Sequence, residues 1–568
     1  RKPSGKEAHD EGTRRGPHLL EGQQRPQIAR CWEPQDAWVL TTVAERSGYT
    51  ATSTSAEVAT FLDGLEGRRA SHRFLRYQPG KSGEGKSLEL IVVSDPPLLL
   101  DPKHLVPHRA ITRALRKSPK LRVLVMANIH GGEVEGKEVV QILLREFSDG
   151  RHSDILKQAN IMFLPIYNVD GNDAINVKNR VSQNGPREGV GRRTNASNID
   201  LNRDFVKVDS PECRTLMRIF RDADPQVFLD LHTTNGSKHA YHLTYATSLA
   251  TNVDPTITSF MRDTYLPEVK RECEALHLLR TFYYGNYAAQ MLKRGWFSFD
   301  HRARYATNYF GLRNRMSVLS EAYSYLNFEM RVMATRAFVL ENLRTLARHA
   351  GEIDLLCRQA DRRAKRGEVT SFGYASKMAA PREGEVLAAE LETVNVEGLG
   401  KTYRVKPGIR RLKMPVRIYF ESTKSVVMPS AWIIPAEYGA VRDNLLRQGI
   451  KVYRLKAAIV CEVESFRPTK ITTAKRKFQD HFEQTLEGTF VRSKQTLPAG
   501  SFVVPAKQAL ARLAAQLLEP QSEDGLATWN FFDDGLKTNP DLSAGESGFP
   551  VLRQVDAAPL ALSRALGL

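Results

Sequence analysis

The sequence is poor in cysteine and has no long apolar run. Its five cysteines are odd in number and none lies close to another along the chain, so we expect neither a disulfide framework nor a cysteine-based zinc site. No run of about 18 apolar residues occurs, so we expect no membrane-spanning helix. The 568 residues, 41% of them hydrophobic and 26% charged, have the composition of a globular protein.

Acidic residues are also scarce relative to basic ones. The sequence has 64 Asp and Glu against 82 Lys and Arg, a formal net charge of +18. A basic surface that is simply solvated explains this excess, and an anionic polymer as a partner stays open. Because no basic motif interleaved with aromatic residues stands out, nucleic acid is not an expected partner.

The pattern of apolar segments predicts the fold class. Residues 1–35 are polar and predict a mobile tail, and residues 36–352 alternate apolar strands with helices. This alternation is typical of an α/β fold with a mixed central sheet and helices on both faces. The predicted strands are Leu88–Val93, Leu121–Asn128, Ile161–Tyr167, Val227–His232 and Met316–Glu321, and the predicted helices are Ser55–Leu62 with a serine cap, Val134–Phe147, Pro211–Ala223, Pro267–Leu278 and Phe328 to about Arg366.

The sequence changes in character after this region. Residues 353–368 predict a helical, basic linker, and residues 369–568 a smaller β-rich domain whose role the sequence does not reveal. Short β-prone runs such as Val416–Phe420 and Val452–Leu455 are separated by Gly, Pro and Lys, and Lys507–Leu518 predicts one helix. No internal repeat is visible.

One short motif carries the chemistry. His130-Gly131-Gly132-Glu133 follows an apolar strand and precedes a helix, and His232 ends another strand far downstream. Two ligands at a strand-to-helix corner and a distant third are how proteins hold a catalytic zinc with one open position. The simpler interpretation, that Glu133 caps the helix and His232 is a core histidine, would prevail for either residue alone.

The surrounding segments resemble the zinc carboxypeptidase family, the metallocarboxypeptidases. Besides the first motif and His232, the resemblance is carried by Asn168-Val169-Asp170-Gly171, Asp200-Leu201-Asn202-Arg203 and Leu319-Ser320-Glu321-Ala322. It covers about residues 36–350 and is closer to bacterial members, with an extra C-terminal domain. Val169 stands where the family usually has proline, and the interval from Asn202 to His232 is shorter than in the digestive enzymes, so side-chain preference does not transfer.

The resemblance implies the roles at the metal centre. His130, Glu133 and His232 hold one zinc ion, and Asp200 accepts the outer N–H of His130. Glu321 is the general base that takes a proton from water and delivers it to the leaving amine.

The resemblance also implies how a substrate is held. Asn202 and Arg203 grip the terminal carboxylate of a peptide, and Arg193 stabilises the oxyanion. Arg187 and Arg192 compete for the role of Arg193. The family has a mobile tyrosine over the substrate, for which Tyr309 is slightly better placed than Tyr305. The nearby His239, His242 and His301 are expected to be structural.

The function implied is a zinc-dependent hydrolase that removes C-terminal residues from peptides with a free terminal carboxylate. A deacylase of N-acyl amino acids shares the ligand pattern, and a non-catalytic binding protein on the same scaffold is a further alternative. In a third, the β-rich domain targets the enzyme to an anionic polymer. The compartment stays open, with no signal peptide visible and the family resemblance favouring an extracellular or periplasmic location.

Overall fold

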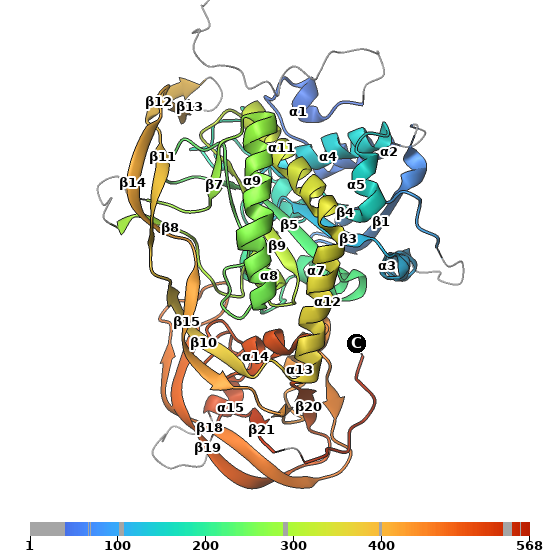
Figure 1. Cartoon of the computed structure of the whole chain (residues 1–568), viewed down its shortest axis with the longest axis vertical. Coiled ribbons are helices and arrows are strands. Elements are labelled where there is room, and N and C mark those ends of the chain that lie inside the picture. The colour runs from blue at the N-terminus through green and yellow to red at the C-terminus, as the bar shows by residue number, and fades with distance from the viewer. Residues whose placement is uncertain are drawn as a thin grey trace, which may run out of the picture.

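The chain folds into an α/β portion joined to a β-rich portion (Figure 1). The computed structural model describes residues 40–65, 68, 70–100, 107–287, 294–396, 400–537, 548–556 and 558–567. The expected mobile tail, residues 1–35, lies outside them. No helix in these ranges is long and apolar enough to cross a membrane.

A mixed eight-stranded sheet forms the centre of the α/β portion. Its strand order is β1-β2-β4-β3-β5-β9-β6-β7, in which the neighbours β4, β3, β5 and β9 run parallel. These four strands are buried along nearly their whole length, as expected for a sheet covered on both faces. The strands are β1 Phe74–Lys81, β2 Ser87–Val93, β3 Leu121–Ala127, β4 Ala159–Leu164, β5 Val227–Thr234, β6 Leu243–Ala246, β7 Thr281–Tyr283 and β9 Met316–Tyr323.

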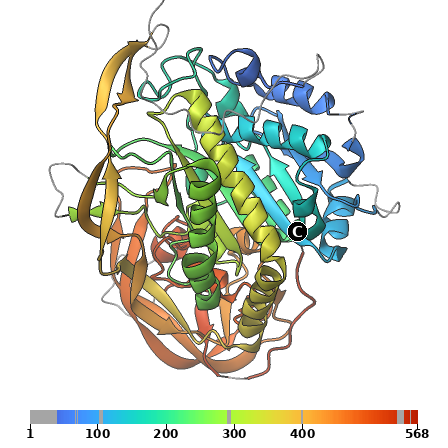
Figure 2. The same cartoon turned by 45° about the horizontal axis from the view of Figure 1, so that its top comes forward.

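Helices cover both faces of this sheet, as the sequence predicts (Figures 1 and 2). On one face, Gly136 of α4 lies against Leu231 of β5; on the other, Phe220 of α7 packs on Phe228 of the same strand. Side chains three residues apart on a strand point to opposite faces. The helices are α1 Val43–Arg46, α2 Ser55–Asp63, α3 Pro107–Lys117, α4 Glu135–Ser148, α5 Ser153–Gln158, α6 Val169–Asp173, α7 Pro211–Ala223, α8 Pro255–Ser259, α9 Leu266–His277, α10 Ala306–Gly311, α11 Phe328–Arg348 and α12 Ala350–Arg366.

Two predicted helices differ from the structure in detail. The cap of α2 is Thr54 rather than Ser55, because the Thr54 hydroxyl accepts the N–H of Glu57, whose carboxylate accepts the N–H of Thr54 in return. The long helix predicted from Phe328 is divided at His349 into α11 and α12.

The β-rich portion follows α12. The β-prone run Val416–Phe420 is divided between two strands, because β14 ends at Arg417 and β15 begins at Phe420. The β-prone residues there belong to two strands that a local pattern cannot separate. The elements are β10 Ser371–Met378, β11 Arg382–Ala388, β12 Leu391–Val396, β13 Gly400–Val405, β14 Arg410–Arg417, β15 Phe420–Val427, β16 Ala431–Ile434, α13 Gly439–Arg447, β17 Tyr453–Arg454, β18 Ile459–Thr473, β19 Gln484–Leu497, β20 Phe502–Pro505, α14 Ala511–Leu518, α15 Asp533–Lys537 and β21 Leu552–Gln554.

The two portions share a core and a sheet. The α/β portion contributes the short strand β8, Trp296–Phe297, which pairs in parallel with β14. Apolar side chains from both portions, including Val123 and Trp529, belong to one buried cluster. Figure 1 shows β11 and β14 running along the flank of the α/β portion, whereas β18 to β21 lie at the lower end of the picture.

Candidate active site

The proposed metal ligands lie at the carboxyl ends of the parallel strands. His130 and Glu133 follow β3, and His232 lies near the end of β5, which pairs with β3. Neighbouring strands are about 4.8 Å apart, so side chains from their ends converge. His232 is also paired in register with Glu321 of β9.

Two glycines allow the loop after β3 to pass close to other backbone. A Cβ on Gly131 would lie 2.2 Å from the carbonyl carbon of Gly171, and one on Gly132 would lie 2.7 Å from the carbonyl oxygen of Gly191. The side chain of Asn168 ties these loops together by donating to the carbonyls of Ile129 and Arg193. The tertiary structure thus explains why both small residues and the Asn168–Gly171 segment accompany the histidine.

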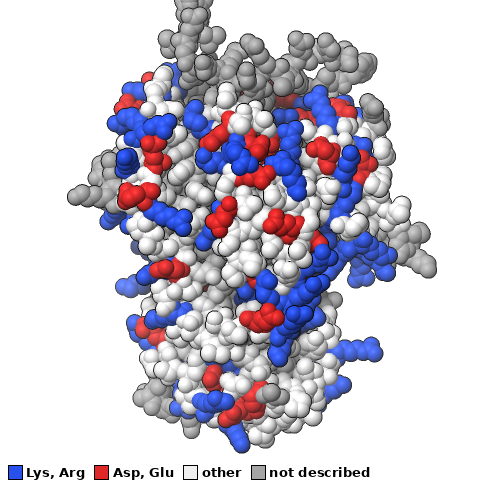
Figure 3. Space-filling model, viewed as in Figure 1, with Lys and Arg blue, Asp and Glu red and all other residues white. Residues whose placement is uncertain are grey.

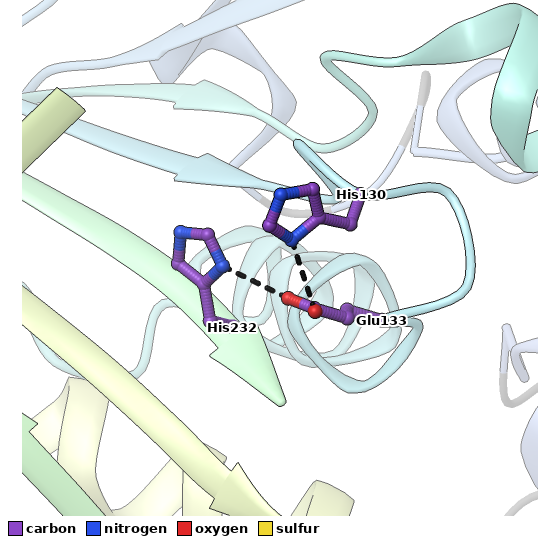
Figure 4. Close-up of side chains that lie close together, drawn as sticks. All are labelled: His130, Glu133 and His232. Carbon is purple, nitrogen blue, oxygen red and sulfur yellow. Dashed lines mark hydrogen bonds and ion pairs between the residues drawn. The ribbon is translucent and has the colours of Figure 1, made fainter. Parts of the chain in front are cut away.

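Three side chains meet around one point (Figure 4). Nδ1 of His130 lies 2.9 Å from one carboxylate oxygen of Glu133, and Nδ1 of His232 lies 2.8 Å from the other. One ligand atom from each residue lies within 4.8 Å of the other two, and all three residues are buried. Glu133 therefore contacts the two histidines rather than capping α4.

Carboxylates and an arginine surround this group. Nε2 of His130 lies 3.1 Å from Asp200 Oδ1, and Nε2 of His232 lies 3.0 Å from Asp230 Oδ2. Each imidazole thus turns one nitrogen inward and the other toward a carboxylate, as ligating histidines do. Arg180 lies 3.0 Å from Glu133 Oε1. Two nitrogens and one carboxylate, each with an outer partner, fit a zinc ion.

The charges in the site act on one another. Burial by itself raises the pKa of Glu133, but the charges of His130 and Arg180 outweigh it and hold that pKa well below its ordinary value. Burial lowers the pKa of His232, while Asp230 and then Glu133 raise it well above the ordinary value. In both cases the neighbouring opposite charge prevails over burial.

Glu321 lies beside the metal ligands in a different electrostatic state. Its residue is only 9% exposed, and among the described residues none donates a hydrogen bond to its carboxylate. Burial raises the pKa of Glu321 to about 8; His232 opposes this rise, and Glu133 and Asp230 add to it. A buried carboxyl with a raised pKa next to a possible metal site is typical of a catalytic base.

The predicted substrate-binding residues and Arg193 lie next to Asp200 in the chain or contact it. Nε of Arg193 donates to Asp200 Oδ2 over 2.9 Å, and Nη1 of Arg193 lies 4.0 Å from Glu133. Asn202 accepts the N–H of Ala306 over 2.9 Å. The guanidinium of Arg203 lies 4.2 Å from the ring centre of Tyr305.

The competing residues lie elsewhere. Arg187 is exposed, and Arg192 donates to the carbonyl of Asn195.

The three nearby histidines have partners away from the metal ligands. His239 stacks on Tyr323, with a ring-centre distance of 3.8 Å. His242 accepts the N–H of Arg280, and His301 contacts Glu523.

Tyr309 is not brought to this site. It is 0% exposed, its ring packs with Phe205 and Phe220, and its hydroxyl accepts from Arg313. The placement of Tyr309 over the substrate therefore needs correction: the residue lies in α10 with its side chain in the core.

Sequence reasoning did not identify Tyr284. Burial raises the pKa of Tyr284, and among the neighbouring charges the carboxylate of Glu321 raises it most. Tyr284 follows the three-residue strand β7, which is too short to be recognised from a pattern. Asp230 and Arg180 were missed too, although Asp230, two residues before His232 on a strand, could have been found from the alternation.

Comparison with known proteins agrees with this geometry. Residues 59–252 match the zinc carboxypeptidase family model. Residues 59–252, about a third of the chain, thus form a zinc carboxypeptidase segment. The chain is therefore a peptide hydrolase that removes C-terminal residues, and zinc is its metal, as the sequence predicted. The matched segment contains the three ligands and Arg203 but ends before Glu321.

Several carboxypeptidases are similar to this chain. Carboxypeptidase 2 of Trichophyton equinum is 21% identical over 431 residues, which are 72% of this chain and 74% of that protein. Carboxypeptidase D of Anas platyrhynchos is 30% identical over 150 residues, 25% of this chain and 9% of that protein. A metallo-carboxypeptidase from Pseudomonas aeruginosa, solved with (2-guanidinoethylmercapto)succinic acid, is 18% identical, with a TM-score of 0.37 and coverage of 53% of this chain and 70% of that chain.

Proposed function

We propose that this carboxypeptidase binds the free carboxylate of a peptide at Asn202 and Arg203 and uses Glu321 as its general base. The observation that carries the proposal is the geometry of His130, Glu133 and His232, whose ligand atoms converge beside the buried carboxyl of Glu321. When bound there, zinc supplies a Lewis acid that activates water and polarises the peptide carbonyl.

The protein's own groups perform the remaining steps. Arg203 pairs with the substrate carboxylate through its planar guanidinium, and the ring of Tyr305 keeps that guanidinium in place. Glu321 accepts a proton from the attacking water and passes it to the leaving amine. The guanidinium of Arg193, 4.0 Å from the ligand Glu133, stabilises the negative charge that develops on the carbonyl oxygen of the substrate. Asp200 orients His130.

The grip on the terminal carboxylate can be tested with matched substrates. Purified protein with measured zinc content is given a peptide with a free C-terminus, the same peptide as its C-terminal amide, and an N-acyl amino acid. We expect cleavage of the free peptide, little cleavage of the amide, and loss of activity on chelation that added zinc restores. Cleavage of the N-acyl amino acid alone would favour the deacylase, and equal cleavage of peptide and amide would refute the grip.

We also propose an anionic polymer as a partner of the basic surface. Figure 3 shows Lys and Arg gathered over α12 and toward α3. The exposed basic residues of this surface are Arg358, Arg362, Lys365 and Arg366 on α12 and Arg109, Arg113, Arg116 and Lys117 on α3.

Retention on an anionic matrix at rising salt measures this binding. Charge reversal at Arg362 and Lys365 should lower the salt concentration of elution, because exposed charges act through a screened field. A charge reversal at Lys494, an exposed lysine of β19, serves as the control. If the Arg362 and Lys365 variant elutes at the same salt concentration as this control, the basic surface does not bind the polymer.

A further inference from the structure

The tip of the β18–β19 hairpin, residues 474–483, reaches the catalytic site from the C-terminal portion. There the backbone N–H of Asp200 donates to the side-chain Oε1 of Gln479 over 2.8 Å. Asp200 begins the short helical turn Leu201–Arg203, and its own side chain contacts His130 and Arg193. A single bond from the hairpin thus holds the start of the segment that carries the carboxylate grip.

The backbone of the tip is unusual where Gln479 stands. Phe478 and His481 exchange both backbone hydrogen bonds across a two-residue turn, and the turn residues Gln479 and Asp480 have φ of 52° and 63°. Turns of this kind favour Asn and Gly, because a left-handed backbone conformation is strained for other residues. Backbone strain at Gln479, whose side chain contacts the Asp200 segment, points to a function for this residue.

Two ion pairs fix the tip beside that segment. Nε2 of His481 lies 2.9 Å from the carboxylate of Asp209, and Glu483 lies 2.6 Å from the guanidinium of Arg304. Asp209 follows the Asp200 segment in the chain and Arg304 belongs to the loop before α10, so the two pairs join the tip to two separate segments of the α/β portion. The tip is therefore docked and not free to swing.

The C-terminal portion also supports the grip from its other side. Asp524 accepts from the backbone and side chain of Arg304, the residue before Tyr305. The ring of Tyr305 lies against Arg203, and the next N–H, of Ala306, is donated to Asn202. The Asn202–Arg203 pair is thus supported twice by the C-terminal portion, through Gln479 at Asp200 and through Asp524 at Arg304.

We propose that Gln479 is a positioning residue of this carboxypeptidase, which fixes the Asp200–Arg203 turn through the backbone of Asp200. The C-terminal portion is then part of the substrate-binding unit. The inference rests on the proposed role of Asn202 and Arg203 in binding the terminal carboxylate. Because the turn acts on substrate binding, its loosening raises KM more than it lowers kcat.

Three variants test this role. Gln479→Met keeps the length of the side chain and removes the acceptor, Gln479→Glu keeps an acceptor, and Arg476→Ala changes an exposed residue of the same tip. With a free-carboxylate peptide we expect Gln479→Met to raise KM by about fivefold, the effect of one lost hydrogen bond. We expect Gln479→Glu to restore most of this loss and Arg476→Ala to leave KM unchanged.

A second readout separates positioning from folding. Zinc affinity is measured by competition with a chelator, and the unfolding midpoint by thermal melting. We expect Gln479→Met to weaken zinc severalfold, because Asp200 orients His130, with a melting midpoint close to that of the wild type. An unchanged KM and zinc affinity would overturn the inference, as would a loss of stability with unchanged KM. If the wild type cleaves no free peptide at all, the proposed function fails first, and the zinc competition still tests Gln479.

Discussion

Replacement of Glu321 by glutamine should separate catalysis from stability. Glutamine has the shape of a protonated glutamic acid and cannot accept a proton as a base. General-base catalysis contributes about 10²- to 10⁴-fold, or about 3–5 kcal/mol of barrier. We therefore expect kcat of Glu321→Gln to fall by at least about a hundredfold, with zinc still bound, because the three ligands are unchanged.

The same substitution should stabilise the metal-free protein at high pH. The folded-state pKa of Glu321 is about 8, above the ordinary value of about 4.3, and a shift of this size corresponds to about 5 kcal/mol at most. Folding raises the pKa of Glu321, so its contribution to the free energy of unfolding is fully present below about pH 4. This contribution is lost as the pH rises through about 8. Glutamine has no such loss.

Urea unfolding of both metal-free proteins at pH 5 and pH 9 measures the difference. We expect the free energy of unfolding of Glu321→Gln to exceed that of the wild type by a larger margin at pH 9 than at pH 5. Bound zinc should reduce this dependence, since a nearby cation favours the carboxylate. A margin that does not change with pH, or a kcat within tenfold of the wild type, would refute the reasoning.

Three further predictions follow from the surrounding contacts. Arg203→Ala should lower kcat/KM for a free-carboxylate peptide by about a hundredfold, since it removes a charge-assisted pair, and should leave the slow cleavage of the amide unchanged in steady-state assays. Asp200→Ala should weaken zinc about 10- to 100-fold in chelator competition, against an unchanged affinity in Tyr309→Phe. Burial lowers the pKa of Lys137 to about 8, so wild-type stability should rise relative to Lys137→Met between about pH 8 and 10; parallel unfolding curves across that range would contradict this.

The sequence determined the α/β class and the metal ligands. Buried parallel strands are continuous apolar runs, so β3, β5 and β9 were recognisable, and chemistry at their carboxyl ends follows from the way such sheets are built. His130 and Glu133 are three residues apart and His232 ends a strand, and together with the family-like segments around them these patterns predicted the metal centre before any tertiary contact was known. The roles proposed for Asp200 and Glu321 come instead from the resemblance of their segments to the zinc carboxypeptidase family, and they stay predictions.

Only the tertiary structure decided which distant groups complete the site. Arg180 and Tyr284 come from irregular segments with no periodicity, so nothing local indicates that Arg180 pairs with Glu133 or that the charge of Glu321 acts on Tyr284. Tyr305 and Tyr309 are both near the expected position in sequence, but burial in α10 directs Tyr309 into the core. The contact of Gln479 with Asp200 joins residues far apart in the chain, and such a pairing depends on how the C-terminal strands dock, which no local pattern encodes.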